Sequence, residues 1–112
     1  MNREQEQCIR NVLRYIPEHL HEKLTIDALC AVAAMSRTVF LRNFKALTGT
    51  TAGRYVMEVR LKKASLLMAS GEKSLRQIAG ETGFYDKAHL FHAFQKYFGT
   101  SPQEYIKSIK RL

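Results

Sequence analysis

Three side chains near position 90 have types and spacing that could do chemistry. His89 and His92 lie three residues apart, and Asp86 lies three residues before His89. On one helix this spacing could hold a metal, or pair an imidazole with a carboxylate as a hydrolase requires. The sequence has no third ligand of zinc type nearby, no nucleophile motif and no glycine-rich phosphate loop, and we expect His89 on the partly buried side of its helix. We therefore predict no metal, no cofactor and no enzyme, and keep a small hydrolase using His89 and His92 only as a second alternative.

The two cysteines, Cys8 and Cys30, are far apart and form no C-x-x-C pair. They predict neither a zinc site nor a disulfide framework, and a reducing compartment such as the cytoplasm is the simpler location. Cys30 falls where two helices would cross at a tight turn, so we expect a small core residue there. The polar N-terminus MNREQEQ does not resemble a signal peptide, and no apolar run has membrane-spanning length, so we expect no membrane partner.

The charge balance points to a polyanionic partner. The 112 residues include 18 Lys and Arg against 10 Asp and Glu, which gives a net charge of +8. DNA, RNA and anionic membrane surfaces all suit such a chain. A chain of this length forms one compact unit or two small lobes and leaves little room for an enclosed small-molecule pocket.

The residues from 74 to 105 have the pattern of a helix-turn-helix. Ser74 is an N-cap type, and Gly83 can turn the chain because glycine enters the left-handed region without steric cost. Asp86 can cap a second helix, which Gly99 ends before Pro102 opens another. In such a motif the second helix can lie in the major groove of DNA. The apolar faces are Leu75, Ile78 and Ala79 on the first helix and Leu90, Phe94 and Phe98 on the second.

The same pattern occurs twice in the chain. Thr25 precedes Ser74 by 49 residues, whereas Gly49 precedes Gly99 by 50, so one extra residue lies around Tyr85 in the second turn. We infer two copies of one supersecondary unit. The matched pairs are Thr25 and Ser74, Leu29 and Ile78, Cys30 and Ala79, Ala34 and Gly83, Met35 and Phe84, Ser36 and Asp86, Phe40 and Leu90, Phe44 and Phe94, and Tyr55 and Tyr105.

Three further helices complete the predicted organisation. Residues 4–20 have an apolar face, with a kink or restart expected near Ile16 because Pro17 removes a backbone donor. Residues 52–69 are rich in helix formers and predict one long connecting helix, and a last basic helix should pack through Tyr105, Ile106 and Ile109. The expected segments are 1–50 for the N-terminal helix and first lobe, 51–70 for the connecting helix, and 71–112 for the second lobe and C-terminal helix.

Three ordered motifs resemble the AraC/XylS transcription regulators. They are RLKKASLL at 60–67, IAGETGF at 78–84 and FQKYFGTSPQEY at 94–105, and the resemblance covers about residues 9–108. It implies an all-α fold of about seven helices, with two homeodomain-like helix-turn-helix lobes joined by a connecting helix. It also implies double-stranded DNA and RNA polymerase as partners. Most members carry a separate effector-binding or dimerisation domain, so this chain would be a stand-alone member or a C-terminal part.

The resemblance further implies which side chains contact bases. The recognition helices would span about 36–47 and 86–98. Val39, Phe40 and Phe44 are candidates for the buried face of the first. Arg42 is the strongest base-contact candidate, since arginine binds guanine in a bidentate manner. Phe91 could instead pack on the connecting helix. The implied base-contact residues are Thr38, Leu41 and Arg42 in the first lobe and Lys87, Ala88, Phe91 and His92 in the second.

Other basic residues fit phosphate contacts, which position a protein without specifying sequence. The helix N-termini after Thr25 and Ser74 can offer backbone amides. The side-chain candidates are Arg37, Lys45, Lys87 and Lys96, with Lys107, Lys110 and Arg111 in the tail.

The family pattern has three departures in this chain. Ala34 replaces a usual glycine, Thr51-Ala52 replaces a common Ser-Pro pair, and Phe91 and His92 stand where Arg or Gln is frequent. We predict a bacterial, cytoplasmic, nucleoid-associated, sequence-specific transcription regulator, and we expect an activator. The first alternative is a nonspecific nucleic-acid-binding or architectural protein, which would bind unrelated duplexes equally at matched salt.

Overall fold

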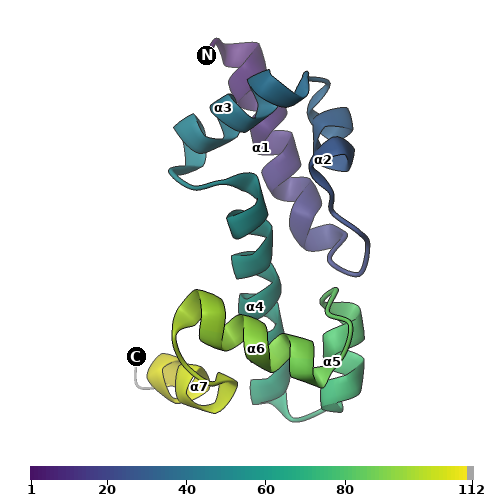
Figure 1. Ribbon diagram of the computed structural model, residues 1–112, viewed down its shortest axis with the longest axis vertical. Helices are drawn as coiled ribbons and strands as arrows, with labels where there is room; N and C mark the ends of the chain where they lie inside the picture. The colour runs from purple at the N-terminus through teal and green to yellow at the C-terminus, as the bar shows by residue number, and fades with distance from the viewer. Residues whose placement is uncertain (111–112) are drawn as a thin grey trace. The chain divides into compact units, whose positions relative to one another are not determined.

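The computed structural model describes residues 1–110, and these residues form seven α-helices and no strand (Figure 1). The chain divides into two compact units, Met1–Val56 and the residues from Met57 onward, and each is described by itself. The predicted all-α fold with two helix-turn-helix lobes is confirmed. The helices are α1 (Arg3–Glu18), α2 (Ile26–Ala33), α3 (Arg37–Thr48), α4 (Ala52–Ser70), α5 (Leu75–Glu81), α6 (Lys87–Phe98) and α7 (Pro102–Lys110).

The first unit packs α1, α2 and α3 against one another. Each helix is amphipathic and buries a stripe of apolar residues at helical spacing. The side chain of Asn2 caps α1, and Thr25 caps α2 by accepting from the Ala28 amide at 3.1 Å. The buried residues of this unit include Ile9, Val12 and Ile16 on α1, Leu29, Cys30 and Ala33 on α2, and Phe40 and Phe44 on α3.

Helix α1 differs from the prediction at Pro17. The helix continues through Pro17 and ends one residue later at Glu18, so no restart occurs near Ile16. A proline this close to a C-terminus interrupts only the last turn, where few backbone bonds remain to be lost. Ile9 is fully buried and Cys8 only half-buried, which places Ile9 on the core face.

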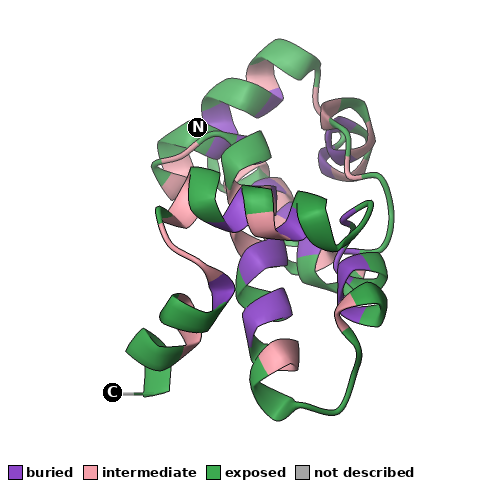
Figure 2. Cartoon of the chain, turned by 60° about the horizontal axis from the view of Figure 1, so that its bottom comes forward, coloured by how far each residue is buried: buried purple, intermediate pink, exposed green. Residues whose placement is uncertain are grey.

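The second unit has one apolar cluster shared by three helices. Figure 2 shows buried residues following one side of each helix. The sequence pattern leaves Val59 and Arg60 as alternatives for the apolar seam of α4. Arg60 is the buried one and Val59 is half-buried, and Leu61, outside that predicted seam, is fully buried. The cluster comprises Leu61 and Ala64 from α4, Ile78 and Ala79 from α5, Phe84 from the turn, and Leu90, Ala93 and Phe94 from α6.

The two turns have closely matching backbones. Ala34 and Gly83 both have positive φ, at 55° and 85°. In each lobe the next amide donates back to the matched carbonyl: Met35 N–H to Cys30 O at 3.2 Å, and Phe84 N–H to Ala79 O at 2.8 Å. This is the hydrogen bond expected where a left-handed residue ends a helix.

Aromatic contacts also repeat from one unit to the other. The rings of Phe44 and Tyr55 lie 5.4 Å apart edge to face, and those of Phe94 and Tyr105 lie 5.8 Å apart. In each case a tyrosine eleven residues after the phenylalanine, on the following helix, contacts the C-terminal half of α3 or α6.

The last helix is less buried than predicted. Tyr105 and Ile106 are half-buried, but Ile109 is 37% exposed because it lies on the last turn of α7, beyond the aromatic contacts. Arg111, a predicted phosphate contact, lies outside the described residues.

Candidate nucleic-acid interface

Helix α3 is fixed at both ends and along one side. The Ser36 hydroxyl accepts from the Val39 amide at 3.3 Å, and Gly49 ends the helix in the left-handed region. Phe40 and Phe44 are fully buried. The side of α3 opposite these two phenylalanines is therefore exposed.

The base-contact candidates of the first lobe all lie on this exposed face. Thr38, Leu41 and Arg42 are exposed, and Lys45 continues the same stripe at i, i+3, i+4 and i+7. Leu41 is 37% exposed and lies next to Arg42 on this face. A leucine side chain suits contact with a thymine methyl, and the guanidinium of a neighbouring arginine suits a guanine.

One assignment on α3 was wrong in detail. Val39 is half-buried, and the third buried position is Asn43. The Asn43 side-chain amide lies 3.9 Å from the Met35 sulfur, as a weak donor to the turn before the helix. Hydrophobic periodicity cannot find a polar residue whose burial depends on a partner eight residues away.

Arg37 forms an ion pair within the first lobe. Its guanidinium lies 3.3 Å from the Asp27 carboxylate on α2, and both side chains are largely exposed. Exposed pairs of this kind are weak and screened by salt. Arg37 can exchange Asp27 for a phosphate at little cost, and Asp27 places a negative charge in the first turn of α2, beside the Thr25 cap.

Helix α6 also has an exposed face opposite its packed side. The Asp86 carboxylate accepts from the His89 amide at 2.8 Å and begins the helix. Lys87, Ala88 and His92 are exposed, as predicted for residues that could face a partner. Phe91 is half-buried and packs against the apolar cluster of the second unit, so the alternative of packing is the one observed.

The predicted placement of His89 on a partly buried side was wrong. His89 is exposed, and its ring lies edge-on to Phe84 at 5.3 Å. Its Nδ1 atom accepts from the Tyr85 amide at 3.2 Å. Asp86 binds the His89 backbone amide and has no contact with the imidazole among the described hydrogen bonds. These groups stabilise a turn, and they form no acid–base pair.

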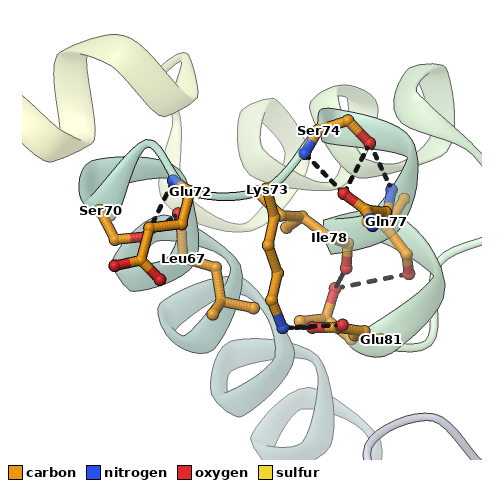
Figure 3. A network of polar contacts seen from close by, with 10 residues as sticks. Leu67, Ser70, Glu72, Lys73, Ser74, Gln77, Ile78 and Glu81 are labelled. Atoms are coloured by element: carbon orange, nitrogen blue, oxygen red, sulfur yellow. Dashed lines mark hydrogen bonds and ion pairs between the residues drawn. The ribbon is translucent and has the colours of Figure 1, made fainter.

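The start of α5 is held by two local interactions (Figure 3). Ser74 and Gln77 form a capping box. The backbone amide of Gln77 donates to the Ser74 hydroxyl at 3.2 Å, and the backbone amide of Ser74 donates to the side-chain Oε1 of Gln77 at 3.0 Å. The Lys73 ammonium lies 2.8 Å from both carboxylate oxygens of Glu81. The predicted N-cap residues Thr25 and Ser74 are thus confirmed as caps. Their contacts with phosphate stay predictions.

The remaining basic candidates are on the surface. Lys45, Lys96, Lys107 and Lys110 are exposed, and the Lys96 ammonium lies 5.4 Å from the centre of the Tyr97 ring. Long basic side chains of this kind are suited to phosphates because they reach out while their stems pack on the surface.

Sequence reasoning did not single out the role of Arg60. Its side chain is 7% exposed, and its Nη1 donates to the Thr82 carbonyl oxygen at 2.8 Å. Burial lowers the pKa of the Arg60 guanidinium, which still stays charged at neutral pH because arginine titrates so far above it. The only sequence signal was the basic residue within the apolar seam of α4.

The buried Cys30 thiol lies in an environment that opposes its ionisation. Burial raises the pKa of the Cys30 thiol, and the nearby Asp27 carboxylate adds to that rise against an opposing effect of Arg37. Within residues 1–110, no three His, Cys, Asp or Glu side chains gather as a metal site would need. No helix in the same range is long and apolar enough to span a membrane.

Comparisons with known proteins agree with this geometry. A family profile described as a helix-turn-helix domain matches residues 29–108. The crystal structure of an AraC-type transcriptional regulator from Chromobacterium violaceum superposes with a TM-score of 0.79 at 25% identity, over 95% of both chains. The chain belongs to the AraC/XylS family. The DNA-binding domain of AdpA, a global transcriptional factor solved in complex with a target DNA, also superposes with a TM-score of 0.79, at 31% identity over 92% of this chain and 93% of that one.

Relatives within the AraC/XylS family are longer than this chain. An uncharacterised regulator from Haemophilus influenzae is 37% identical over 75% of this chain and 28% of its own length. The regulator MtrA of Neisseria gonorrhoeae is 28% identical over 92% of this chain and 34% of its own. The transcriptional activator RhaS of Escherichia fergusonii is 31% identical over 86% of this chain and 34% of its own length. The chain spans about a third of the length of these relatives.

Proposed function

We propose that this AraC/XylS-family chain is a sequence-specific DNA-binding domain that places α3 and α6 in two adjacent major-groove segments. Such segments lie one helical turn, about 34–36 Å, apart on one face of DNA. The observation that carries the proposal is the exposed stripe of Thr38, Leu41 and Arg42 on a helix whose other side is fully packed. The solved complex of AdpA with a target DNA supports DNA as the partner.

The first lobe would supply most of the base discrimination. Arg42 offers a bidentate guanidinium for guanine O6 and N7, worth about 1–3 kcal/mol against a wrong base. Among the candidates of the second lobe Lys87, Ala88 and His92 are exposed, whereas Phe91 packs against the apolar cluster. The second lobe would therefore contribute weaker base preference and more backbone anchoring.

The net charge of +8 would add salt-dependent affinity through phosphate neutralisation. Arg37, Lys45 and Lys96 are exposed and can supply part of it, together with backbone amides near the caps Thr25 and Ser74. This electrostatic part carries no sequence information, so it alone would describe the nonspecific alternative.

Activation rather than repression is the regulatory outcome we propose. The family implies contacts with RNA polymerase, and the name of the Escherichia fergusonii relative as a transcriptional activator supports this direction. A separate effector-binding or dimerisation domain would belong to the whole protein, as would a nucleoid-associated location in the cytoplasm. A hydrolase has no support, because Asp86 and His89 both bind backbone groups.

The test is a selection of binding sites from a random duplex pool at near-physiological salt. We expect an enriched motif covering two adjacent major-groove segments, with Arg42→Ala erasing the preference at one segment. Arg14→Ala, which removes an exposed arginine of α1 in the same unit, is the matched control and should leave the motif intact. Uniform binding to unrelated duplexes would favour the architectural alternative instead.

A further inference from the structure

A surface groove in the second lobe has a charge arrangement that the matching positions of the first lobe lack. The groove has a volume of about 780 Å³, within the range of small-ligand sites. It lies between α5 and the start of α6 and is lined by Leu75, Arg76, Gly80, Tyr85, Asp86 and Lys87.

The internal repeat shows what stands at the same places in the first lobe. Arg76 lies 49 residues after Asp27, and Lys87 lies 50 residues after Arg37. In the first lobe Asp27 and Arg37 form an ion pair at 3.3 Å. In the second lobe the same two positions hold two cations, so that pair cannot form.

Two like charges facing one groove repel each other unless an anion lies between them. Arg76 and Lys87 are both exposed, and neither takes part in an ion pair among the described residues. The single carboxylate of the groove, Asp86, is already engaged as the N-cap of α6. Asp86 keeps its negative charge, so the lining holds two cations against one carboxylate and is net positive.

Tyr85 is the residue that the second turn has gained relative to the first. Its side chain is 92% exposed, although a tyrosine usually buries much of its ring. Its amide is held by His89 Nδ1 at 3.2 Å, which fixes the backbone from which the side chain projects. A phenol at the rim adds a hydrogen-bond donor of a type that contacts DNA phosphates.

We propose that this groove binds a backbone phosphate of DNA, with Arg76 and Lys87 neutralising it and Tyr85 contacting the adjoining backbone. The proposal rests on the proposed function, because it names the part of the duplex that the second lobe grips. It makes the lobes unequal, because at the equivalent place in the first lobe Asp27 pairs with Arg37 and a phosphate would have to displace that carboxylate.

The experiment measures duplex affinity of the whole chain over a series of salt concentrations. Each phosphate contact contributes about 0.9 to the slope of log affinity against log salt. Arg76→Ala and Lys87→Ala should each weaken binding and lower the slope by about that amount, and Arg76→Ala, which lies outside the base-contact candidates, should leave the selected motif unchanged. Lys63→Ala removes an exposed cation of α4 in the same unit, outside the groove, and should change the slope much less.

A charge reversal separates loss of binding from loss of folding. Arg76→Asp recreates with Lys87 the charge pattern of the first lobe, so it should weaken duplex binding more than Arg76→Ala does. Its thermal unfolding midpoint should equal or exceed that of the unmodified chain. The same loss of affinity with a lowered midpoint would mean that the substitution acts on the fold, and the proposal would fall.

The remaining outcomes distinguish the groove from the function. If the unmodified chain selects a motif but Arg76→Ala behaves like Lys63→Ala, the groove holds no phosphate and the DNA-reading proposal stands. If the unmodified chain binds no duplex at any salt, both proposals are overturned together.

Discussion

The guanidinium of Arg60 donates to the carbonyl oxygen of Thr82 across 2.8 Å in the interior of the second lobe. Thr82 follows α5 directly and is fully buried, and its hydroxyl donates to the Ile78 carbonyl at 2.6 Å. The carbonyl end of a helix carries partial negative charge, so a buried cation stabilises it. Arg60 thereby positions the turn from which α6 begins.

Replacing Arg60 should destabilise the second lobe. Arg60→Ala leaves the buried Thr82 carbonyl without this donor, and we expect the free energy of unfolding to fall by about 1.5–3 kcal/mol. Arg60→Lys should recover only part of it, because lysine is a point donor on a differently shaped stem. Urea denaturation followed by circular dichroism gives the values, with the exposed Lys62→Ala as control, expected within about 0.5 kcal/mol of the unmodified chain. An unchanged midpoint for Arg60→Ala would refute this role.

Ala34 holds a backbone conformation that favours glycine. It is the one non-glycine residue with positive φ in residues 1–110. Ala34→Gly should therefore raise the free energy of unfolding by about 0.5–1 kcal/mol, as the relief of left-handed strain exceeds the added entropy of the unfolded chain. Ala33→Gly, one residue earlier and helical, should lower it by about 1 kcal/mol. Thermal melts of both variants test this, and shifts of the same sign would contradict it.

The two thiols should differ in reactivity. Cys30 is buried with a raised pKa, so little of the reactive thiolate forms near neutral pH, whereas Cys8 is half-buried. Iodoacetamide should label Cys8 first in the folded chain and both equally in urea, as followed by mass spectrometry. A Cys8→Ser variant retains only Cys30 and should therefore react slowly with iodoacetamide. Equally fast labelling of both cysteines in the native chain would show that Cys30 is accessible.

We expect His92 to carry the base preference of the second lobe. If α6 lies in a major groove, His92→Arg should add a guanine preference at that segment worth about 1–3 kcal/mol. Site selection with His92→Arg and His92→Ala side by side measures the gain. Identical motifs from both variants would indicate that this exposed face of α6 does not reach the bases.

The local features of the fold could be predicted from sequence because they depend on neighbouring residues. N-caps at Thr25, Ser36, Ser74 and Asp86 each accept from an amide three residues on. The turn at Gly83 follows from glycine's access to positive φ. Since these signals recur in both copies, the repeat made the two-lobe fold predictable without any tertiary information.

The features that sequence reasoning missed depend on contacts between distant residues. Arg60 is buried because Thr82, 22 residues away, offers a carbonyl, and Asn43 is buried beside Met35. The prediction for the burial of His89 was wrong because its ring contacts Phe84 and accepts a hydrogen bond from the Tyr85 amide, and neither contact can be seen in the helical spacing. Polar burial is set by partners, which hydrophobic periodicity does not record.

Helix α4 belongs to both compact units, and this affects how the chain can be dissected. Its first residues complete the first unit with Ala52, Tyr55 and Val56, and from Met57 the same helix begins the second. A cut between Val56 and Met57 would leave up to four amides and four carbonyls without helical partners. A separately expressed lobe would therefore need the whole of Ala52–Ser70, and the two fragments would have to overlap by that one helix.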